Sequence, residues 1–206
     1  MKIIVLDTET LGLDNPLIYD CGYIIYDTEL KAKIKEKSYI IKQIFDNEQL
    51  FATAYYHKKR PLYIERLKSG YSKKVGWGSL VNYLKKDIEK YNIDFVGAYN
   101  SRFDYRAFDK TCSLYNKPNP LAKLDPVEND IMNFIGVITD TQDYKDFCEI
   151  NGFMTKHAKP RPQKKAETLH AFITNNASYE EEHTGLEDSK IELDILLECR
   201  LRLGLD

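Results

Sequence analysis

The sequence predicts an α/β fold, in which a central mixed sheet begins with a three-stranded antiparallel meander and is flanked by helices. Two observations lead to this fold class. Three consecutive segments near the start are rich in β-forming residues. After them, segments with helical spacing alternate with a short apolar run, FVGAY, at residues 95–99. No shift in composition marks a boundary, so we expect one domain over residues 1–206.

The expected strands follow from short runs of β-forming residues. The first covers residues 2–8, where the apolar run IIVL leads into DTET. The second and third cover residues 19–27 and 31–43 and form a hairpin through the short turn TEL at residues 28–30. Residues 129–138 have no period that decides between strand and helix, and both remain open.

Helices are expected over most of the rest of the chain. The clearest period is in SLVNYLKKDIEKY, where apolar residues recur at intervals of three and four. The expected helical segments are residues 47–67 with a break at Pro61, residues 79–91, residues 101–115 with Asn100 or Ser101 as N-cap, and residues 141–151, 164–175 and 185–203.

Composition excludes several classes of protein. The chain has no apolar run of membrane length, and the apolar stretch in MKIIVLDTET is too short for a signal peptide, so we expect a cytoplasmic protein without a membrane partner. Its four cysteines form no CxxC pair, which indicates neither a zinc site nor a disulfide framework. A net charge of −2 argues against coating nucleic acid through bulk positive charge, although an enzyme can still bind a few phosphates locally.

Two acids at the end of the first strand, Asp7 and Glu9, point to a bound cation. Alternate residues of a strand share one face, so both carboxylates follow Ile3 and Val5 on the same face. Like charges held close together raise each other's pKa, and a cation removes this conflict. The alternative is a solvated strand end.

Asp188 is expected to face the core from the last helix. It shares a stripe with Ile191 and Ile195, and a buried carboxylate is costly unless it is paired or bound to a metal. Pairing with Arg102 or Arg106 is the alternative to a metal. Other acids of the same helix can be solvated, namely Glu187, Glu192 and Asp194.

Asp104 and His183 complete the candidate set. Asp104 lies in the first turn of a helix directly after FVGAY, at the kind of junction where α/β proteins form sites. Its alternative role is to complement the helix dipole. His183 precedes the last helix, and near a carboxylate site it is suited by its pKa to take a proton from water.

Together these residues resemble the motifs of the DnaQ-like 3′–5′ exonucleases of the DEDDh type, which have a ribonuclease H-like fold. The family's Asp-x-Glu motif corresponds to residues 7–9, its Asn-x-x-Phe-Asp motif to residues 100–104, and its His-x4-Asp motif to residues 183–188. The motifs occur in the family's order and span nearly the whole chain. One departure is Tyr99, where the family often has histidine, which bears on substrate contact.

The resemblance implies a role for each candidate. Asp7 would bridge two divalent cations, Mg²⁺ or Mn²⁺, while Glu9 and Asp188 complete the site that holds the attacking water. Asp104 would contact the second cation, and His183 would take the proton of the water. Without metal, the acids should retain at least one proton, and His183 should stay protonated against them.

The resemblance also implies contacts to the 3′-terminal nucleotide from the loop at residues 10–13. Gly12 would allow a close backbone approach, and Leu11 or Leu13 would wedge against the base, unless one of them fills the core. Further substrate-contact candidates are Thr10, Tyr99, Asn100 and Phe103, of which Phe103 is interpreted first as a core residue.

Two basic segments have open interpretations. KHAKPRPQKK, residues 156–165, holds five Lys or Arg in ten residues and is either an exposed loop or an arm that contacts phosphates of a single strand. HKKR, residues 57–60, is interpreted as a solvated helix end.

The expected function is a metal-dependent 3′–5′ exonuclease that releases nucleoside monophosphates from the 3′ end of single-stranded DNA. An exoribonuclease acting on RNA tails or short oligoribonucleotides is the first alternative, because the sequence does not show whether the site accepts a 2′-hydroxyl. A non-catalytic nucleic-acid-binding module and a phosphatase of free nucleotides are further alternatives. The expected partner is single-stranded nucleic acid, DNA rather than RNA.

Overall fold

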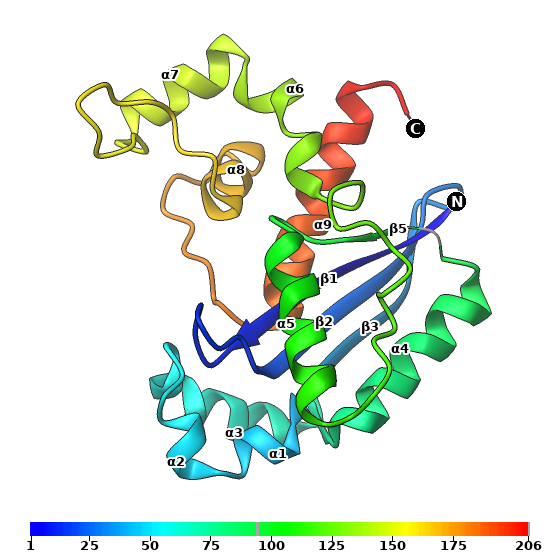
Figure 1. Ribbon diagram of the computed structural model, residues 1–206. Helices are drawn as coiled ribbons and strands as arrows, with labels where there is room; N and C mark the ends of the chain where they lie inside the picture. Colours follow the sequence, from blue (N-terminus) through cyan, green and yellow to red (C-terminus); the bar gives the residue numbers. More distant parts are fainter. Residues whose placement is uncertain (94, 206) are drawn as a thin grey trace.

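The computed structural model describes residues 1–93 and 95–205 and has a five-stranded mixed sheet at its centre, with the strand order β4-β3-β2-β1-β5 (Figure 1). Helices cover both faces of this sheet (Figure 1). The predicted α/β class is therefore confirmed. Within the described ranges, no helix combines the length and apolar character needed to cross a bilayer.

The antiparallel meander predicted at the start of the chain is confirmed. β1 (Lys2–Thr10) pairs with β2 (Ile18–Asp27), and β2 pairs with β3 (Ala32–Ile41), both antiparallel. Two short strands then extend the sheet in parallel, β5 (Phe95–Gly97) beside β1 and β4 (Lys73–Val75) beside β3.

The sheet differs from the expected one at both edges. No strand was expected at β4, which has three residues and no clear β-forming pattern. At the other edge, the undecided segment 129–138 makes only a single parallel bridge, between Ala98 and Asp130. It continues as a 3₁₀ turn, η2 (Ile131–Asn133), and a one-turn helix, α6 (Gly136–Thr139). Elements of one turn carry no amphipathic repeat, so their period could not identify them.

Most helices lie within a few residues of their predicted ranges. The exception is the segment 47–67, which is a series of short helices instead of one broken helix. Pro61 lies in the first turn of its helix and begins it, because that turn needs no backbone donor from proline. The remaining helices are α1 (Lys42–Phe45), α2 (Glu48–Phe51), η1 (His57–Lys59), α3 (Arg60–Ser69), α4 (Trp77–Tyr91), α5 (Arg102–Leu114), α7 (Gln142–Ile150), α8 (Ala166–Ile173) and α9 (Gly185–Arg202).

The two faces of the sheet bury different helices. Ile4 and Leu6 of β1 pack in one apolar cluster with α4 and α5. Ile3 and Val5 pack on the opposite face with α9, and α7 and α8 join the same cluster. A third cluster joins helices α1 to α3 to the ends of β2 and β3, and we call these helices the α1–α3 lobe. The alternation predicted for β1 is confirmed, and Asp7 follows on the α9 face.

Helix α9 begins directly on the backbone of β2. Gly22 lies opposite Asp7 in the register of β1 and β2. A Cβ atom at Gly22 would lie 2.0 Å from the backbone nitrogen of Leu186, so only glycine allows this approach. Asp20, also on β2, accepts the backbone N–H of Gly185 at 2.9 Å through Oδ2 and caps the start of the helix. The first turn of α9 is thereby held over the end of β1.

Candidate active site

The structure brings together the four acids that the sequence singled out. Asp7 and Glu9 come from β1, and Asp104 and Asp188 come from the first turns of α5 and α9. Burial raises the pKa of Asp7 well above its usual range, and the charges of the other three acids raise it further. Thr8 donates a hydrogen bond from Oγ1 to Oδ1 of Asp104 at 2.7 Å, which ties α5 to β1 at this point.

A fifth acid, Glu192, lies in the same group, so the expectation that it is solvated is wrong. It follows Asp188 by one helical turn, and residues four apart share a face of a helix. Only 4% of Glu192 is exposed. Among the neighbouring acids its charge has the largest effect in raising the pKa of Asp7, which indicates that the two carboxylates are close. The four-residue spacing was the available signal in the sequence.

The acids of this cluster keep protons near neutral pH when no cation is present, as predicted. Burial raises the pKa of Asp104 to about 7, against the opposing effect of its hydrogen bond from Thr8. Burial, followed by the charges of Glu181 and Asp20, raises the pKa of Asp188 to about 8. The ionised cluster is therefore unfavourable without positive charge.

Three carboxylate oxygens of the cluster suit a divalent cation. Asp7 Oδ2, Asp188 Oδ1 and Glu192 Oε2 are buried and find no hydrogen-bond partner among the described residues. Such oxygens are unusual in folded proteins unless a proton, water or ion satisfies them. Hard oxygen ligands in this number favour Mg²⁺ or Mn²⁺ over softer metals. The donor set therefore fits the cations that the sequence motifs imply.

His183 lies beside the cluster in the loop before α9. One of its ring nitrogens and one oxygen each of Glu9 and Asp188 all lie within 4.8 Å of one another. Burial, followed by the charge of Lys59, lowers the pKa of His183 below its usual value. The prediction that His183 stays protonated without metal is therefore wrong, since desolvation and a nearby ammonium outweigh the attraction of the acids.

The α1–α3 lobe holds the loop that carries His183. Lys59 donates from Nζ to the backbone carbonyls of Glu182 and His183, the latter at 3.5 Å. Arg66 of α3 donates to Thr184 Oγ1 at 2.8 Å and also pairs with Glu182. These contacts join residues more than 100 positions apart, so no local pattern in the sequence could predict them.

The sequence suggested that HKKR is a solvated helix end, and this interpretation is wrong. Besides the contacts of Lys59, the guanidinium of Arg60 lies 4.6 Å from the ring centroid of Phe45 and 5.3 Å from that of Phe51. Both aromatic residues belong to the cluster that packs the α1–α3 lobe. Two of the four basic residues thus stabilise structure beside the candidate site.

A surface pocket of about 740 Å³ adjoins the acid cluster. It contains His183 and Glu192 together with the predicted substrate residues Tyr99 and Asn100. The end of the basic segment lines it too, through Lys164 and Lys165. Two other basic residues of that segment, Lys159 and Arg161, line a neighbouring pocket of about 800 Å³ that shares Lys164. The C-terminal end of the basic segment therefore borders the site.

The loop after β1 divides between core and surface. Leu11 is 6% exposed and belongs to the cluster of the α1–α3 lobe, whereas Leu13 is 74% exposed. Thr10 is buried next to Leu11. An added Cβ at Gly12 would meet no protein atom within 4 Å, and the close approach of a nucleotide to its backbone stays a prediction. Only Leu13 of the two leucines remains free to contact a base.

Phe103 is half-buried, and none of the three apolar clusters of the described residues includes it. The interpretation of Phe103 as a core residue is therefore wrong. Arg106 lies between it and the loop, with its guanidinium 5.5 Å from the ring centroid of Phe103 and its Nη2 donating to the Leu13 carbonyl at 3.2 Å. Leu13 and Phe103 are thus linked through one side chain at the edge of the site.

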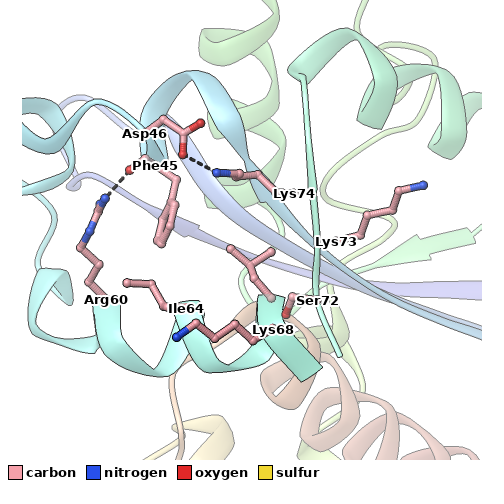
Figure 2. Close-up of a pocket in the computed structure, with 9 residues that line it drawn as sticks. Phe45, Asp46, Arg60, Ile64, Lys68, Ser72, Lys73 and Lys74 are labelled. Atoms are coloured by element: carbon pink, nitrogen blue, oxygen red, sulfur yellow. Dashed lines mark hydrogen bonds and ion pairs between the residues drawn. The ribbon is translucent and has the colours of Figure 1, made fainter. Parts of the chain in front are cut away.

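A second pocket, of about 550 Å³, contains none of the residues predicted for the site. Figure 2 shows it beside α3, with the basic side chains of Lys68, Lys73 and Lys74 around it. Lys74 pairs with Asp46 at 2.7 Å, and Arg60 donates to the Phe45 carbonyl at 2.7 Å (Figure 2). This pocket offers one acid, already paired, and so lacks the acid cluster that a cation site needs.

No protein-family model matches this chain, and no curated protein matches it significantly. The relation to DnaQ-like exonucleases is therefore a resemblance carried by three short motifs. The four acids of these motifs come from β1, α5 and the start of α9, and they lie in one cluster with His183 beside it.

Proposed function

We propose that this chain is a metal-dependent 3′–5′ exonuclease with a ribonuclease H-like fold, acting on single-stranded DNA. The observation that carries the proposal is the group of buried carboxylates with unpartnered oxygens beside His183 and a pocket lined by both lysines and glutamates. The three motifs shared in order with DnaQ-like exonucleases support the same chemistry, and the direction of digestion comes from that resemblance.

Asp7, Glu9, Asp104 and Asp188 would hold two divalent cations, Mg²⁺ or Mn²⁺. When bound, such ions stabilise the attacking and leaving oxygens of an in-line displacement at phosphorus. The four acids reach this place from β1, α5 and α9, so the packing of both helices on the sheet pre-organises them. Asp7 is affected by the charges of both Asp104 on α5 and Asp188 on α9, and it would serve both cations.

His183 would act as the general base that removes a proton from the attacking water. An imidazole must be neutral to accept a proton, and burial lowers the pKa of His183 in this structure. Its ring lies within reach of Glu9 and Asp188, the acids expected to position the water. The base and the acids thus belong to one group.

The substrate would enter along the pocket that adjoins the acid cluster. Lys164 and Lys165 line this pocket and would contact phosphates of a single strand. The exposed side chain of Leu13 and the half-exposed ring of Phe103 would meet the terminal base. Release of a nucleoside monophosphate leaves a 3′-hydroxyl on the shortened strand for the next cycle.

The proposal is tested with single-stranded DNA labelled at its 5′ end and incubated with Mg²⁺, Mn²⁺ or EDTA. A ladder of shortened labelled products that EDTA abolishes is the expected result. Prompt release of a labelled mononucleotide would indicate the opposite polarity, and no digestion with either cation would overturn the proposal. An identical oligoribonucleotide in parallel distinguishes a deoxyribonuclease from an exoribonuclease.

A further inference from the structure

We propose that Glu192 is a fifth carboxylate ligand of the divalent cation site. This inference rests on the proposed function and extends the metal-binding set beyond the four acids of the sequence motifs. Glu192 belongs to none of the three motifs, so the motifs give it no role.

The position of Glu192 is unusual for an acid that has only a structural role. It is 4% exposed, and its Oε2 is buried with no hydrogen-bond partner among the described residues. It lies one turn beyond Asp188 on α9, on the same face of the helix. It also lines the pocket that holds His183, so its carboxylate borders the space where substrate and cations would lie.

The charged side chains that shift the pKa of Glu192 are acids, not bases. Burial raises the pKa of Glu192 well above its usual range, and the charges of Asp104 and Asp188 raise it further, while the backbone N–H of Tyr99 opposes the shift. The ion pairs found among the described residues include none to Glu192. A buried carboxylate without a cationic partner must bind a proton or a metal ion.

The neighbours of Glu192 indicate which part of the site it serves. Glu9, Asp188 and His183 form one close group that does not include Glu192. Asp104 is the acid with the largest charge effect on Glu192, and Glu192 is the one with the largest effect on Asp7. Outside that close group the proposed four-acid set supplies Asp7 and Asp104, and the unpartnered oxygen of Glu192 would add a third carboxylate to them.

The inference is tested by titrating the full chain with Mn²⁺ and measuring the free ion by electron paramagnetic resonance. The variant is Glu192→Gln, which keeps the size of the side chain and removes the charge. The matched control is Asp194→Asn, an exposed acid on the same helix. We expect the Glu192 variant to bind one of its ions about 10- to 100-fold more weakly. The control should match the wild type.

Thermal unfolding supplies a second readout that separates a ligand from a structural residue. Without cation, Glu192→Gln should unfold at or above the wild-type temperature, because a buried acid among acids has been neutralised. With Mn²⁺, its rise in Tm should be smaller than that of the wild type. If this variant does not fold, Glu192→Asp shortens the carboxylate and should weaken Mn²⁺ binding in the same direction.

The outcomes separate this inference from the proposed function. Two Mn²⁺ ions bound by both wild type and Glu192→Gln with equal affinity would overturn the inference alone. A lower Tm without cation together with unchanged Mn²⁺ affinity would also overturn it, by showing a structural role. No Mn²⁺ uptake by the wild type would remove both proposals.

Discussion

The imidazole of His183 stacks face to face on the ring of Tyr56, with ring centroids 4.7 Å apart and planes inclined by 13°. His183 has φ of 52°, a left-handed conformation that residues with a Cβ rarely adopt and that costs about 1–3 kcal/mol. Lys59 secures this conformation through the His183 carbonyl and lies 4.6 Å from the Tyr56 ring centroid. The α1–α3 lobe therefore orients the imidazole from outside the acid cluster.

The first prediction concerns Tyr56. Tyr56→Ala removes the surface on which the imidazole rests, so we expect kcat for single-stranded DNA to fall by roughly 10- to 100-fold, the cost of a small misplacement of a reacting group. Tyr56→Phe keeps the ring and should retain most of the activity. Lys58→Ala, at an exposed position of η1, is the control. Wild-type kcat in Tyr56→Ala would show that the stacking does not position His183.

His183 and Asp7 should affect different steps. His183→Ala should lower turnover by about 10²–10⁴-fold, the usual contribution of a general base, and should keep Mn²⁺ affinity. Asp7→Asn should abolish both Mn²⁺ binding and activity, because it removes the acid shared by both cations. Loss of Mn²⁺ affinity in His183→Ala would instead assign the imidazole to the metal ligands, which its proximity to Glu9 and Asp188 allows.

The acid cluster should make stability depend on pH and on cations. The pKa of Asp104 is raised to about 7 and that of Asp188 to about 8, against about 4 for an unfolded aspartate. The folded state therefore binds more protons than the unfolded state between pH 4 and pH 8. This contribution to stability is complete below about pH 4 and is lost as the pH rises toward 8.

Differential scanning calorimetry without cation should thus show Tm falling between pH 5.5 and pH 8.5, by about 2–4 °C for each kcal/mol lost. Mg²⁺ or Mn²⁺ should raise Tm more at pH 8.5 than at pH 5.5, because the ions bind the deprotonated acids. Asp104→Asn should flatten the pH dependence measured without cation. An apo protein more stable at pH 8.5 than at pH 5.5 would contradict the assignment of raised pKa values.

The contact between Gly22 and α9 gives a prediction about folding. Gly22→Ala places a Cβ 2.0 Å from the Leu186 nitrogen, so helix or strand must move. We expect the free energy of unfolding to fall by about 1–3 kcal/mol or more. Mn²⁺ affinity should fall with it, because Asp188 moves with the helix. Gly12→Ala enters open space and should leave Tm unchanged in the same denaturation experiment.

The parts of the fold that the sequence predicted are those with a repeated local pattern. The meander and the helices α4, α7, α8 and α9 are each long enough to show a run of β-forming residues or a helical repeat of apolar residues. The edge strand β4 and the short turns η2 and α6 have three or four residues, and tertiary packing decides their conformation. Pro61 was misjudged because its meaning depends on where the helix begins.

The residues of the candidate site were also predicted only in part. Asp7, Glu9 and Asp104 were predicted as site acids because a strand end and a helix N-terminus locate them, and Asp188 because it shares a stripe with Ile191 and Ile195. Glu192 was missed although its spacing from Asp188 was visible, because α9 buries a wider face than that stripe, including Leu193 and Leu196.

No local pattern in the sequence predicts the contacts that hold His183 in place. Tyr56, Lys59 and Arg66 reach the loop at residues 182–184 across more than 100 positions of sequence. Their role follows from the docking of the α1–α3 lobe on that loop, which only the three-dimensional arrangement reveals.

The last prediction concerns the two lysines at the end of the basic segment. Lys164 and Lys165 line the pocket beside His183, so they should contact phosphates upstream of the terminal nucleotide. Replacing both with glutamine should raise KM several-fold on long single strands and reduce the salt dependence of KM, while digestion of a dinucleotide should change little. Lys110→Gln, at an exposed position of α5, serves as the control. An unchanged KM at every substrate length and salt concentration would show that the segment is an ordinary exposed loop.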